Sequence, residues 1–175
     1  MNQSFWTSID SLPEDLLLSK ELVYDKCSYT CSLPVSEAES SEYGAHEFKL
    51  NNLAIKFRIA KTTPTKIGQF VTLWKRSKAG PIAPFDLSDK IDFFIISTRK
   101  GKRLGLFIFP KAVLCEHGIV STKTTEGKRA IRVYPSWDKT ESKQAQKTQK
   151  WQLNYFLEIP EKDIVDIKQA KALLS

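Results

Sequence analysis

An aspartate and a lysine of this sequence have the types and the spacing that metal-assisted cleavage of a phosphodiester needs. Asp92 precedes one apolar run, Lys111 follows the next, and Gly101 lies between the two runs. A hairpin that turns at Gly101 places Asp92 opposite Pro110, next to Lys111. In such chemistry a carboxylate holds Mg²⁺, and a lysine assists the attacking water or stabilises charge. Asp92 is therefore a candidate metal ligand, and Asp92 and Lys111 are candidate catalytic residues.

This pair lacks one part that the chemistry needs. A second carboxylate is expected two residues before the lysine, and that position holds Phe109. An ordinary ion pair between Asp92 and Lys111 at a strand end explains the pattern equally well. We expect Mg²⁺ as a cofactor if the protein is catalytically active. A replacement ligand would then come from a neighbouring acid, Asp86, Asp89 or Glu116.

Two other patterns have simpler explanations. Glu47 and Lys49 form a literal Glu-x-Lys sequence, but a turn at residues 51–52 places Glu47 opposite Lys56, as a cross-strand ion pair. Four potential zinc ligands are loosely spaced, and ordinary cysteines are commoner than zinc sites. These four are Cys27, Cys31, Cys115 and His117. No Gly-x-Ser-x-Gly sequence, Walker loop or glycine-rich dinucleotide fingerprint is present.

Basic residues are concentrated between positions 56 and 78. Lys56 and Arg58 alternate with apolar residues, which predicts a strand with one buried and one solvated face, the basic residues lying on the solvated one. Threonines, Gln69 and Trp74 lie in the same stretch. Basic and hydroxyl groups contact phosphates, and an exposed aromatic ring offers a base a stacking surface. The predicted phosphate contacts here are Arg58, Lys61, Lys66, Lys75 and Arg76.

A second group of lysines follows a helical spacing. Positions 139, 143, 147 and 150 are all lysine and share one helix face, with glutamines around them. A lysine row without acids on its own face repels itself unless an anion lies across it. We predict a second phosphate clamp at Lys143, Lys147 and Lys150, with Trp151 as a stacking residue. The alternative for both groups is a solvated lysine face with core tryptophans. The basic segment 99–103 is either a phosphate contact or a soluble turn.

Composition indicates a globular protein with a polyanionic partner. The chain has 175 residues, of which 41% are apolar, and a formal net charge of +7. This length allows one domain with a substantial core, and the positive excess favours nucleic acid or another polyanion. No apolar run reaches the length of a membrane span, and the N-terminus lacks the basic region of a signal peptide. We therefore expect a cytoplasmic protein with reduced cysteines.

Hydrophobic periodicity predicts one domain, with residues 1–44 as an N-terminal helix and loop and 45–175 as the core. Residues 93–96 and 106–109 are apolar without alternation, which is typical of central strands covered on both faces. We expect an α/β (α+β) fold with a mixed, mostly antiparallel central sheet and helices on both sides. The predicted helices are 11–24, with Ser11 as its N-cap, 139–156 and 162–174. The predicted strands are a hairpin over 47–60, then 69–75, 92–98, 104–110 and 130–134.

Several long segments resemble the MepB family. They include FRIAKTTPTKIGQFVTLWKR (57–76), IAPFD (82–86), DFFIIS (92–97), FIFPK (107–111), GKRAIRVYPSWD (127–138) and AQKTQKWQ (145–152). The resemblance covers about residues 40–157. It implies a fold related to restriction-type endonucleases of the PD-(D/E)xK class and binding of DNA or RNA. Such proteins are similar to one encoded beside a bacterial multidrug efflux pump and its repressor. The class motif would map onto Asp92 and Lys111, with Phe109 in place of its acid.

The sequence thus favours one hypothesis and leaves two alternatives open. The favoured hypothesis is a nucleic-acid-binding protein with a nuclease-like core. Little sequence specificity is expected, because no base-reading element is visible. The first alternative is an active Mg²⁺-dependent endonuclease, in which Asp92 holds the metal and Lys111 acts as base or electrostatic helper. The second is a protein-interaction module that uses the basic surface to bind an acidic partner.

Overall fold

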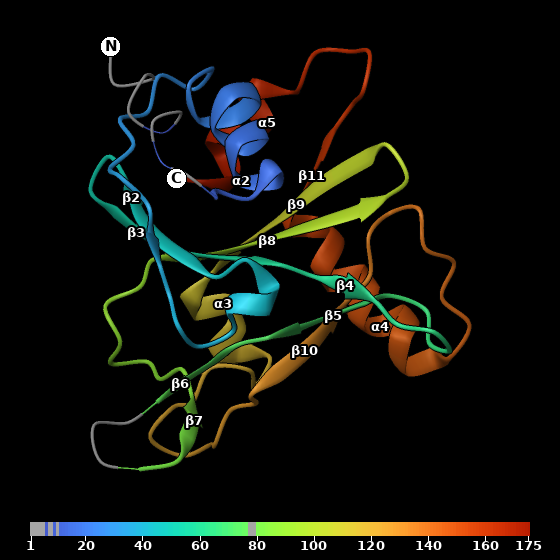
Figure 1. Cartoon of the computed structure of the whole chain (residues 1–175). Helices are drawn as coiled ribbons and strands as arrows, with labels where there is room; N and C mark the ends of the chain where they lie inside the picture. The colour runs from blue at the N-terminus through green and yellow to red at the C-terminus, as the bar shows by residue number, and fades with distance from the viewer. Residues whose placement is uncertain (1–5, 7–8, 10, 77–79) are drawn as a thin grey trace.

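The computed structural model describes residues 6, 9, 11–76 and 80–175. Its largest element is a six-stranded sheet in the order β1-β2-β3-β8-β9-β11 (Figure 1). β3 and β8 run parallel and the other neighbouring pairs run antiparallel, which confirms the predicted mixed, mostly antiparallel sheet. The strands are β1 Val35–Ser36, β2 His46–Leu50, β3 Leu53–Ile59, β8 Phe93–Lys100, β9 Arg103–Pro110 and β11 Phe156–Ile159.

The two predicted hairpins form the centre of this sheet. Asn51 turns the chain between β2 and β3 with a φ of 53°, and Gly101 turns it between β8 and β9 with a φ of 60°. Turn position fixes the pairing register. The backbone N–H of Lys111 accordingly donates to the carbonyl of Asp92 at 3.1 Å, just beyond the last paired residues of β8 and β9. The sequence predicted this proximity correctly.

The central strands bury side chains on both of their faces, as their continuous apolar runs predicted. Ile95 of β8 and Leu106 of β9 belong to a core cluster on one face of the sheet. Ile96 and Phe107, one residue further along each strand, belong to a second cluster on the other face. Successive residues of a strand point to opposite faces, so a run without polar residues needs cover on both sides.

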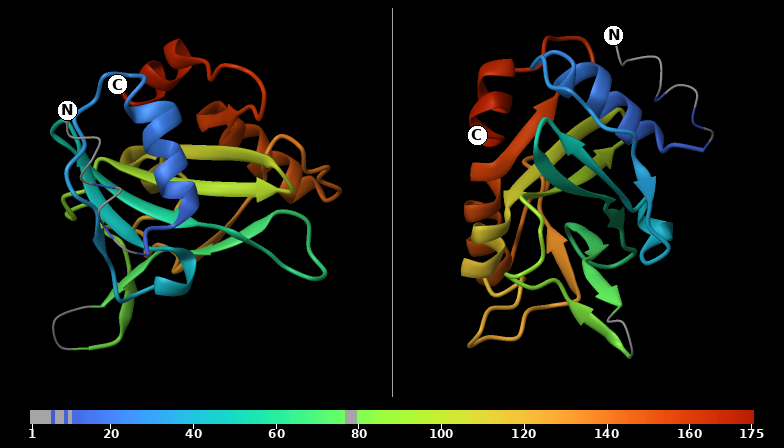
Figure 2. Two further views of the ribbon diagram at one scale, coloured as in Figure 1. Left: turned by 45° about the horizontal axis from the view of Figure 1, so that its top comes forward. Right: turned by 90° about the vertical axis from the view of Figure 1, so that its left-hand side faces the viewer.

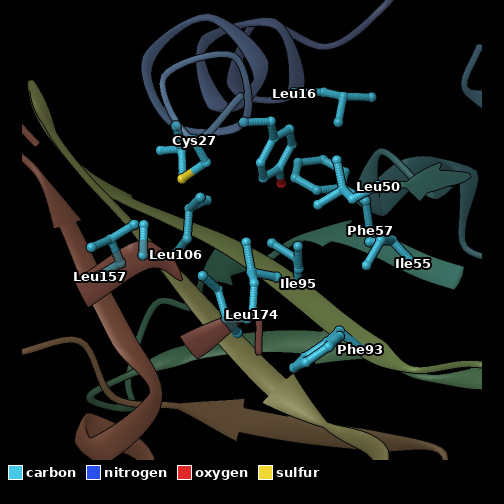
Figure 3. Packing of buried hydrophobic residues seen from close by; sticks show 14 of the residues in the cluster. Leu16, Cys27, Leu50, Ile55, Phe57, Phe93, Ile95, Leu106, Leu157 and Leu174 are labelled. Carbon is cyan, nitrogen blue, oxygen red and sulfur yellow. The ribbon is translucent and has the colours of Figure 1, made fainter. Parts of the chain in front are cut away.

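Helices from both ends of the chain cover the first face (Figure 2). They are α2 Glu14–Ser19, which continues as the π-helix η1 Lys20–Tyr24, and α5 Ile167–Leu173. Leu16 and Cys27 from the N-terminal part and Leu174 after α5 pack with Phe57 and Ile95 of the sheet (Figure 3).

The boundaries of both helices differ from those predicted. The first begins at Glu14 after Pro13, and no side chain caps it, so the prediction of Ser11 as its N-cap is wrong. Ser11 instead has a φ of 68°, which lies outside the geometry of an N-cap. α5 begins five residues later than the predicted start at 162, where Asp166 accepts from the N–H of Gln169.

A second, smaller sheet contributes to the cover on the other face, where only helices were expected. It has the order β10-β5-β4, and the helices α3 and α4 stand beside it (Figure 1). The alternating burial of β5 and β10 turns Val71, Ile131 and Val133 inward against the main sheet. The bounds are β4 Lys61–Thr62, β5 Gln69–Thr72, β10 Ala130–Val133, α3 Lys111–Glu116 and α4 Lys143–Gln152.

The single strand predicted over 69–75 is two strands in two sheets. After β5 the chain continues as β6 Trp74–Arg76, which pairs with β7 Ile82–Pro84 in a separate two-stranded sheet. Residues 25–44, which follow the first predicted helix and were predicted as loop, contain a short 3-10 helix, η2 Ser41–Tyr43. Among the described residues no helix is long and apolar enough to cross a membrane.

The helix predicted over 139–156 is shorter at both ends. α4 begins at Lys143, where the Ser142 hydroxyl accepts from the N–H of Ala145 at 3.1 Å. It ends in a 3-10 turn, η3 Leu153–Tyr155, and the next residues form strand β11 beside β9. Strand β11 was not predicted, because Phe156, Leu157 and Ile159 are compatible with a helical pattern until their pairing partner is known.

Candidate nucleic-acid interface

A basic groove lies between strand β10 and helix α4. Its volume is about 770 Å³. Four of its lining residues are basic and one is acidic, while Ile119, Ala130 and Ile131 line an apolar part. The basic residues are Lys66, Lys128, Arg132 and Lys147, and the acidic residue is Glu141. The groove therefore collects positive charge from four separate segments of the chain.

Glutamine side chains attach α4 to the edge of β10. Gln152 is 1% exposed, its amide oxygen accepts from the N–H of Tyr134 at 2.9 Å, and its amide nitrogen donates to the carbonyl of Arg132 at 3.0 Å. Gln149 donates to the carbonyls of Pro135 and Asp138, each at 2.9 Å. The amide groups thus replace a missing strand partner. The sequence suggested that Gln149 accompanies the lysines at the surface, whereas it holds the helix in place.

The lysines of α4 face away from these anchors. Lys143, Lys147 and Lys150 are exposed, as the helical spacing predicted, and Lys147 lines the groove. Lys139 precedes the helix, so it is not part of this face. Within the described chain no carboxylate lies within 4.0 Å of Lys66, Lys128 or any lysine of α4. These ammonium groups are therefore available to an external anion.

An aromatic stack stands in the wall of the groove. The rings of His117 and Trp151 lie parallel, with centroids 3.8 Å apart and an interplanar angle of 6°. Trp151 is half-buried and rests on Phe109, at 5.5 Å between centroids, while His117 is exposed. Trp151 was predicted as a stacking residue for bases; in the structure it lies beside the lysines, but its ring stacks on His117 and rests on Phe109. The sequence singled out His117 only as a potential zinc ligand and did not predict its place in this stack, because His117 follows α3 and meets Trp151 only through tertiary packing.

Arg132 holds part of the groove wall in place and also contributes positive charge to it. Its Nη1 donates to the Thr63 hydroxyl at 3.0 Å and to the carbonyl of Gly68 at 3.2 Å, which holds the loop between β4 and β5. Its guanidinium carbon lies 6.0 Å from the ring of Phe70, which stands between Lys61 and Arg132 in the strand register. Lys61 itself lies over the ring of Tyr43 at 4.6 Å. The outer face of the small sheet is thus a basic and aromatic extension of the groove.

Arg58 does not lie on the solvated face of its strand, and that prediction is wrong. It is 1% exposed and points between the two sheets, where Nη1 donates to Glu37 at 2.5 Å. Lys56 joins the same carboxylate at 2.6 Å and Glu47 at 2.8 Å, so the predicted cross-strand ion pair is confirmed. The alternation of residues along β3 correctly indicated two faces. The second face, however, packs against the small sheet and does not meet water. Phosphate contact by Arg58 would need this packing to open.

Lys75 and Arg76 lie on β6, away from the groove (Figure 1). Each has an acidic neighbour: Lys75 pairs with Asp89 at 2.7 Å, and Arg76 with Glu39 at 3.6 Å. Three of the four basic residues of the turn 99–103 also pair with acids: Arg99 with Asp15 at 2.6 Å, Arg103 with Glu158 at 2.8 Å and Lys102 with Glu161 at 3.6 Å. The structure therefore brings together the lysines of α4 with Lys66 and Trp151, and separates Lys75 and Arg76 from them.

The side chains of Asp92 and Lys111 point to different partners. Asp92 Oδ2 accepts from the backbone N–H of Ala54 at 2.7 Å. The ammonium of Lys111 donates to the carbonyls of Leu87 and Asp89, at 2.9 and 2.7 Å. Both side chains hold neighbouring backbone, and the described structure contains no ion pair between them. The simple ion pair suggested as an alternative is therefore not formed.

Two of the three acids named as replacement ligands, Asp86 and Asp89, are also engaged. Asp86 accepts from the N–H and the hydroxyl of Ser88, each at 2.8 Å, and the backbone bond is the largest cause that lowers the pKa of Asp86. Asp89 accepts from Asp86 N–H and from Lys75. Phe109 is fully buried and stacks on Phe107 at 5.4 Å. Mg²⁺ prefers six oxygen ligands in octahedral geometry, and no group of three potential ligands gathers among the described residues. This donor set does not fit a Mg²⁺ site.

The four potential zinc ligands do not meet. Cys27 and Cys31 belong to the core cluster under the N-terminal helix, and burial raises the pKa of Cys31 to about 11. Cys115 packs against the cluster on the opposite face of the sheet, near the segment that carries His117. Since the main sheet separates the two pairs, the zinc alternative is wrong.

Comparison with known proteins identifies the relatives of this chain. A family model described as MepB-like matches residues 37–158. The solved structure titled "Crystal Structure of MepB" is 33% identical, with a TM-score of 0.74, and the match covers 86% of this chain and 99% of that one. A bacterial homing endonuclease, I-Ssp6803I, is 12% identical over 74% of this chain and 81% of its own, with a TM-score of 0.44. No curated protein matches. The chain belongs to the MepB-like family.

Proposed function

We propose that this protein binds nucleic acid in the groove between β10 and α4, with little preference for sequence. The observation that carries the proposal is the coincidence, in one groove, of unpaired lysines and a stacked aromatic pair. Lysines without carboxylate partners attract phosphates, and aromatic rings accept bases of any identity. A cytoplasmic protein that encounters DNA or RNA would use both kinds of contact.

Weak specificity follows from the kinds of groups that line the groove. Sequence is read by side chains that reach base edges in a duplex groove, whereas lysine ammonium groups contact phosphates. Lys66, Lys128 and Lys147 are of the phosphate-contacting kind. The apolar residues Ile119, Ala130 and Ile131 make contacts that do not depend on base identity. Binding should therefore vary more with salt than with sequence.

The proposal does not involve Asp92 or Lys111, whose side chains hold backbone outside the groove. The endonuclease alternative can be separated from it by one variant. Asp92→Ala should leave the affinity for nucleic acid unchanged, whether or not Mg²⁺ is added. If the protein cut nucleic acid in Mg²⁺ and Asp92→Ala abolished the cutting, the catalytic role of Asp92 would be supported.

The test is a salt titration of binding with matched charge variants. Lys66, Lys128 and Lys147 are changed to alanine together, and fluorescence anisotropy is measured with labelled oligonucleotides. The control changes Lys162, Lys168 and Lys171, which are exposed on or just before α5, the helix that packs on the other face of the main sheet. Both variants lose three positive charges, so a difference between them reports position and not net charge.

The expected result is a smaller salt dependence for the groove variant alone. Each lost phosphate contact lowers the slope of log K against log salt by roughly 0.7 to 0.9. Three contacts therefore predict a slope that is about 2 units smaller, while the control keeps the wild-type slope. Equal losses in the two variants would show that binding depends on net charge and not on the groove.

A further inference from the structure

The aromatic stack of the groove has one open surface. Trp151 covers one face of the His117 ring at 3.8 Å, in a parallel arrangement. His117 is nevertheless an exposed residue, and it lines the groove. Since one ring face is covered, the exposed surface of the ring is its other face and its edge. One face of the His117 ring is thus free in the groove. The other face is supported by Trp151, which itself rests on Phe109.

A free stacking face selects a particular state of nucleic acid. In a duplex each base is covered above and below by its neighbours, and a protein ring reaches a base face only if that base is extruded or unpaired. The groove volume of about 770 Å³ lies within the range of clefts, about 300–1,000 Å³, that enclose small ligands. A concave site of this size with its ring in the wall suits individual nucleotides rather than the side of a double helix.

The charges around the ring suit a strand that passes through the groove. Lys66 and Lys128 come from segments beside the small sheet, while Lys147 comes from α4. Lys143 and Lys150 continue the positive charge along the exposed side of the helix. Single-stranded nucleic acid is commonly bound by this combination, in which basic residues follow the backbone and rings accept the bases.

We propose that the groove binds single-stranded nucleic acid and that one base stacks on the free face of His117. The inference rests on the proposed function, because it assumes that the groove is the binding site. DNA and RNA strands share the bases and phosphates that these groups contact, so both are expected to bind. The backing by Trp151 gives His117 a fixed ring orientation, which reduces the entropy lost when a base stacks on it.

The experiment compares strands and ring variants at constant salt. Labelled oligo-dT and oligo-U of 12 nucleotides and a duplex of the same length are titrated with wild-type protein, His117→Ala and His117→Phe. We expect the single strands to bind at least ten times more tightly than the duplex. His117→Ala should weaken single-strand binding roughly 5- to 100-fold, as is usual for loss of one stacked base. His117→Phe should restore most of the affinity, because it keeps a flat ring.

An abasic oligonucleotide separates stacking from charge. It keeps the phosphates and lacks the bases, so it should bind wild-type protein no more tightly than oligo-dT binds His117→Ala. It should also be insensitive to His117→Ala, because the lost interaction is already absent, which is the logic of a double-mutant cycle. The slope of affinity against salt should be the same for His117→Ala and wild type. Thermal unfolding of each variant checks that the fold is retained.

The outcomes distinguish this inference from the proposed function. Duplex binding as tight as single-strand binding, with the groove lysines still required, would leave the proposed function standing and overturn the single-strand inference. Unchanged oligo-dT affinity in His117→Ala, or equal losses in His117→Ala and His117→Phe, would also overturn it. If no oligonucleotide bound at low salt, the proposed function would fail as well.

Discussion

At the scale of single residues, Gln152 is the clearest structural requirement of the groove. Its amide is almost completely buried and bonds both the N–H of Tyr134 and the carbonyl of Arg132. A buried backbone group that loses its partner costs about 1–3 kcal/mol. Gln152→Leu keeps the size of the side chain but leaves both groups without partners. We therefore predict that it lowers the free energy of unfolding by about 2–3 kcal/mol in urea titrations.

The matched control for this prediction is Gln144→Leu. Gln144 is exposed on the same helix, and within the described part of the chain its side chain makes no hydrogen bond to backbone. Its substitution should change the free energy of unfolding by less than about 0.5 kcal/mol. Similar losses for the two variants would mean that Gln152 does not replace a strand partner at the edge of β10.

Asp138 provides a prediction with a definite pH dependence. Burial raises the pKa of Asp138, partly offset by Lys100. The folded protein therefore holds this proton to higher pH than the unfolded chain does, and stability falls as pH rises through the interval between the two pKa values. Above that interval the carboxylate is ionised in both states, and its burial lowers the free energy of unfolding by the full amount. Asp138→Asn should consequently raise the unfolding temperature at pH 7.

The partial exposure of Asp138 limits the size of this effect, and an exposed glutamate provides the control. The side chain of Asp138 is only partly buried, so screening keeps the expected gain below about 1 kcal/mol. The gain should disappear as pH falls below the ordinary pKa of an aspartate, about 4. Glu21→Gln, at an exposed position, should give no gain at either pH. A gain that is equal at pH 3 and pH 7 would contradict the role given to ionisation.

Residue types were predicted better than residue environments. The spacing of Lys143, Lys147 and Lys150 was sufficient to predict an exposed face, because helical geometry alone determines which residues share it. The alternation around Arg58 showed two strand faces, but it could not show that a second sheet covers the face on which Arg58 lies. Whether a face meets water or protein is decided by distant segments, which local periodicity does not contain.

At the scale of elements, the first helix depends on one buried ion pair. Asp15 of α2 is 6% exposed and accepts from the Ser97 hydroxyl and from Arg99 Nε, each at 2.6 Å. These bonds fix α2 on β8. Asp15→Ala leaves the buried Ser97 hydroxyl without its partner and Arg99 with only the more distant Glu14, and loss of one member of a buried pair costs about 3–5 kcal/mol. We predict a loss at the lower end of this range, because Arg99 is partly exposed.

The neighbouring acid is the control for this prediction. Glu14 lies 3.9 Å from the same arginine, but its side chain is 80% exposed. Glu14→Ala should change the free energy of unfolding by less than about 1 kcal/mol, as is usual for exposed pairs. Equal effects of the two substitutions in urea unfolding would show that burial does not determine the contribution of Asp15.

Elements with strong periodicity were predicted, and elements defined by their partners were not. The two hairpins followed from period-two alternation, apolar runs and turn residues such as Asn51 and Gly101. Strand β11 was not predicted: the predicted helix ended at Phe156 and no element was assigned to residues 157–159, which are a strand by virtue of their pairing with β9. The split of 69–75 into β5 and β6 likewise reflects pairing with two different distant strands.

At the scale of the whole molecule, the groove is a product of tertiary structure. Its basic residues come from the loop before β5, from the segment before β10, from β10 itself and from α4. The sequence indicated Lys66, Lys147 and Trp151 as members of two separate patches, and the fold unites them. Lys128 and His117 joined no predicted patch, since neither has a regular spacing to other site residues.

Tertiary structure also explains why the sequence predicted the proximity of Asp92 and Lys111 but not the partners of their side chains. Turn position and register are local properties, so the proximity of Asp92 and Lys111 was predictable. The directions of their side chains are set by Ala54, Leu87 and Asp89, which belong to other parts of the fold. Catalysis by these two residues stays a prediction, and Asp92→Ala tests it as described above.

The measurement that tests the central claim most directly is photo-crosslinking with peptide mapping. Full-length protein is irradiated with oligonucleotides that carry a photoreactive uracil, and the crosslinked tryptic peptides are identified by mass spectrometry. The groove predicts crosslinks within residues 112–123, which contain His117, and 151–162, which begin with Trp151. Crosslinks confined to β6 and β7 or to the turn 99–103, with none at these two peptides, would contradict the account.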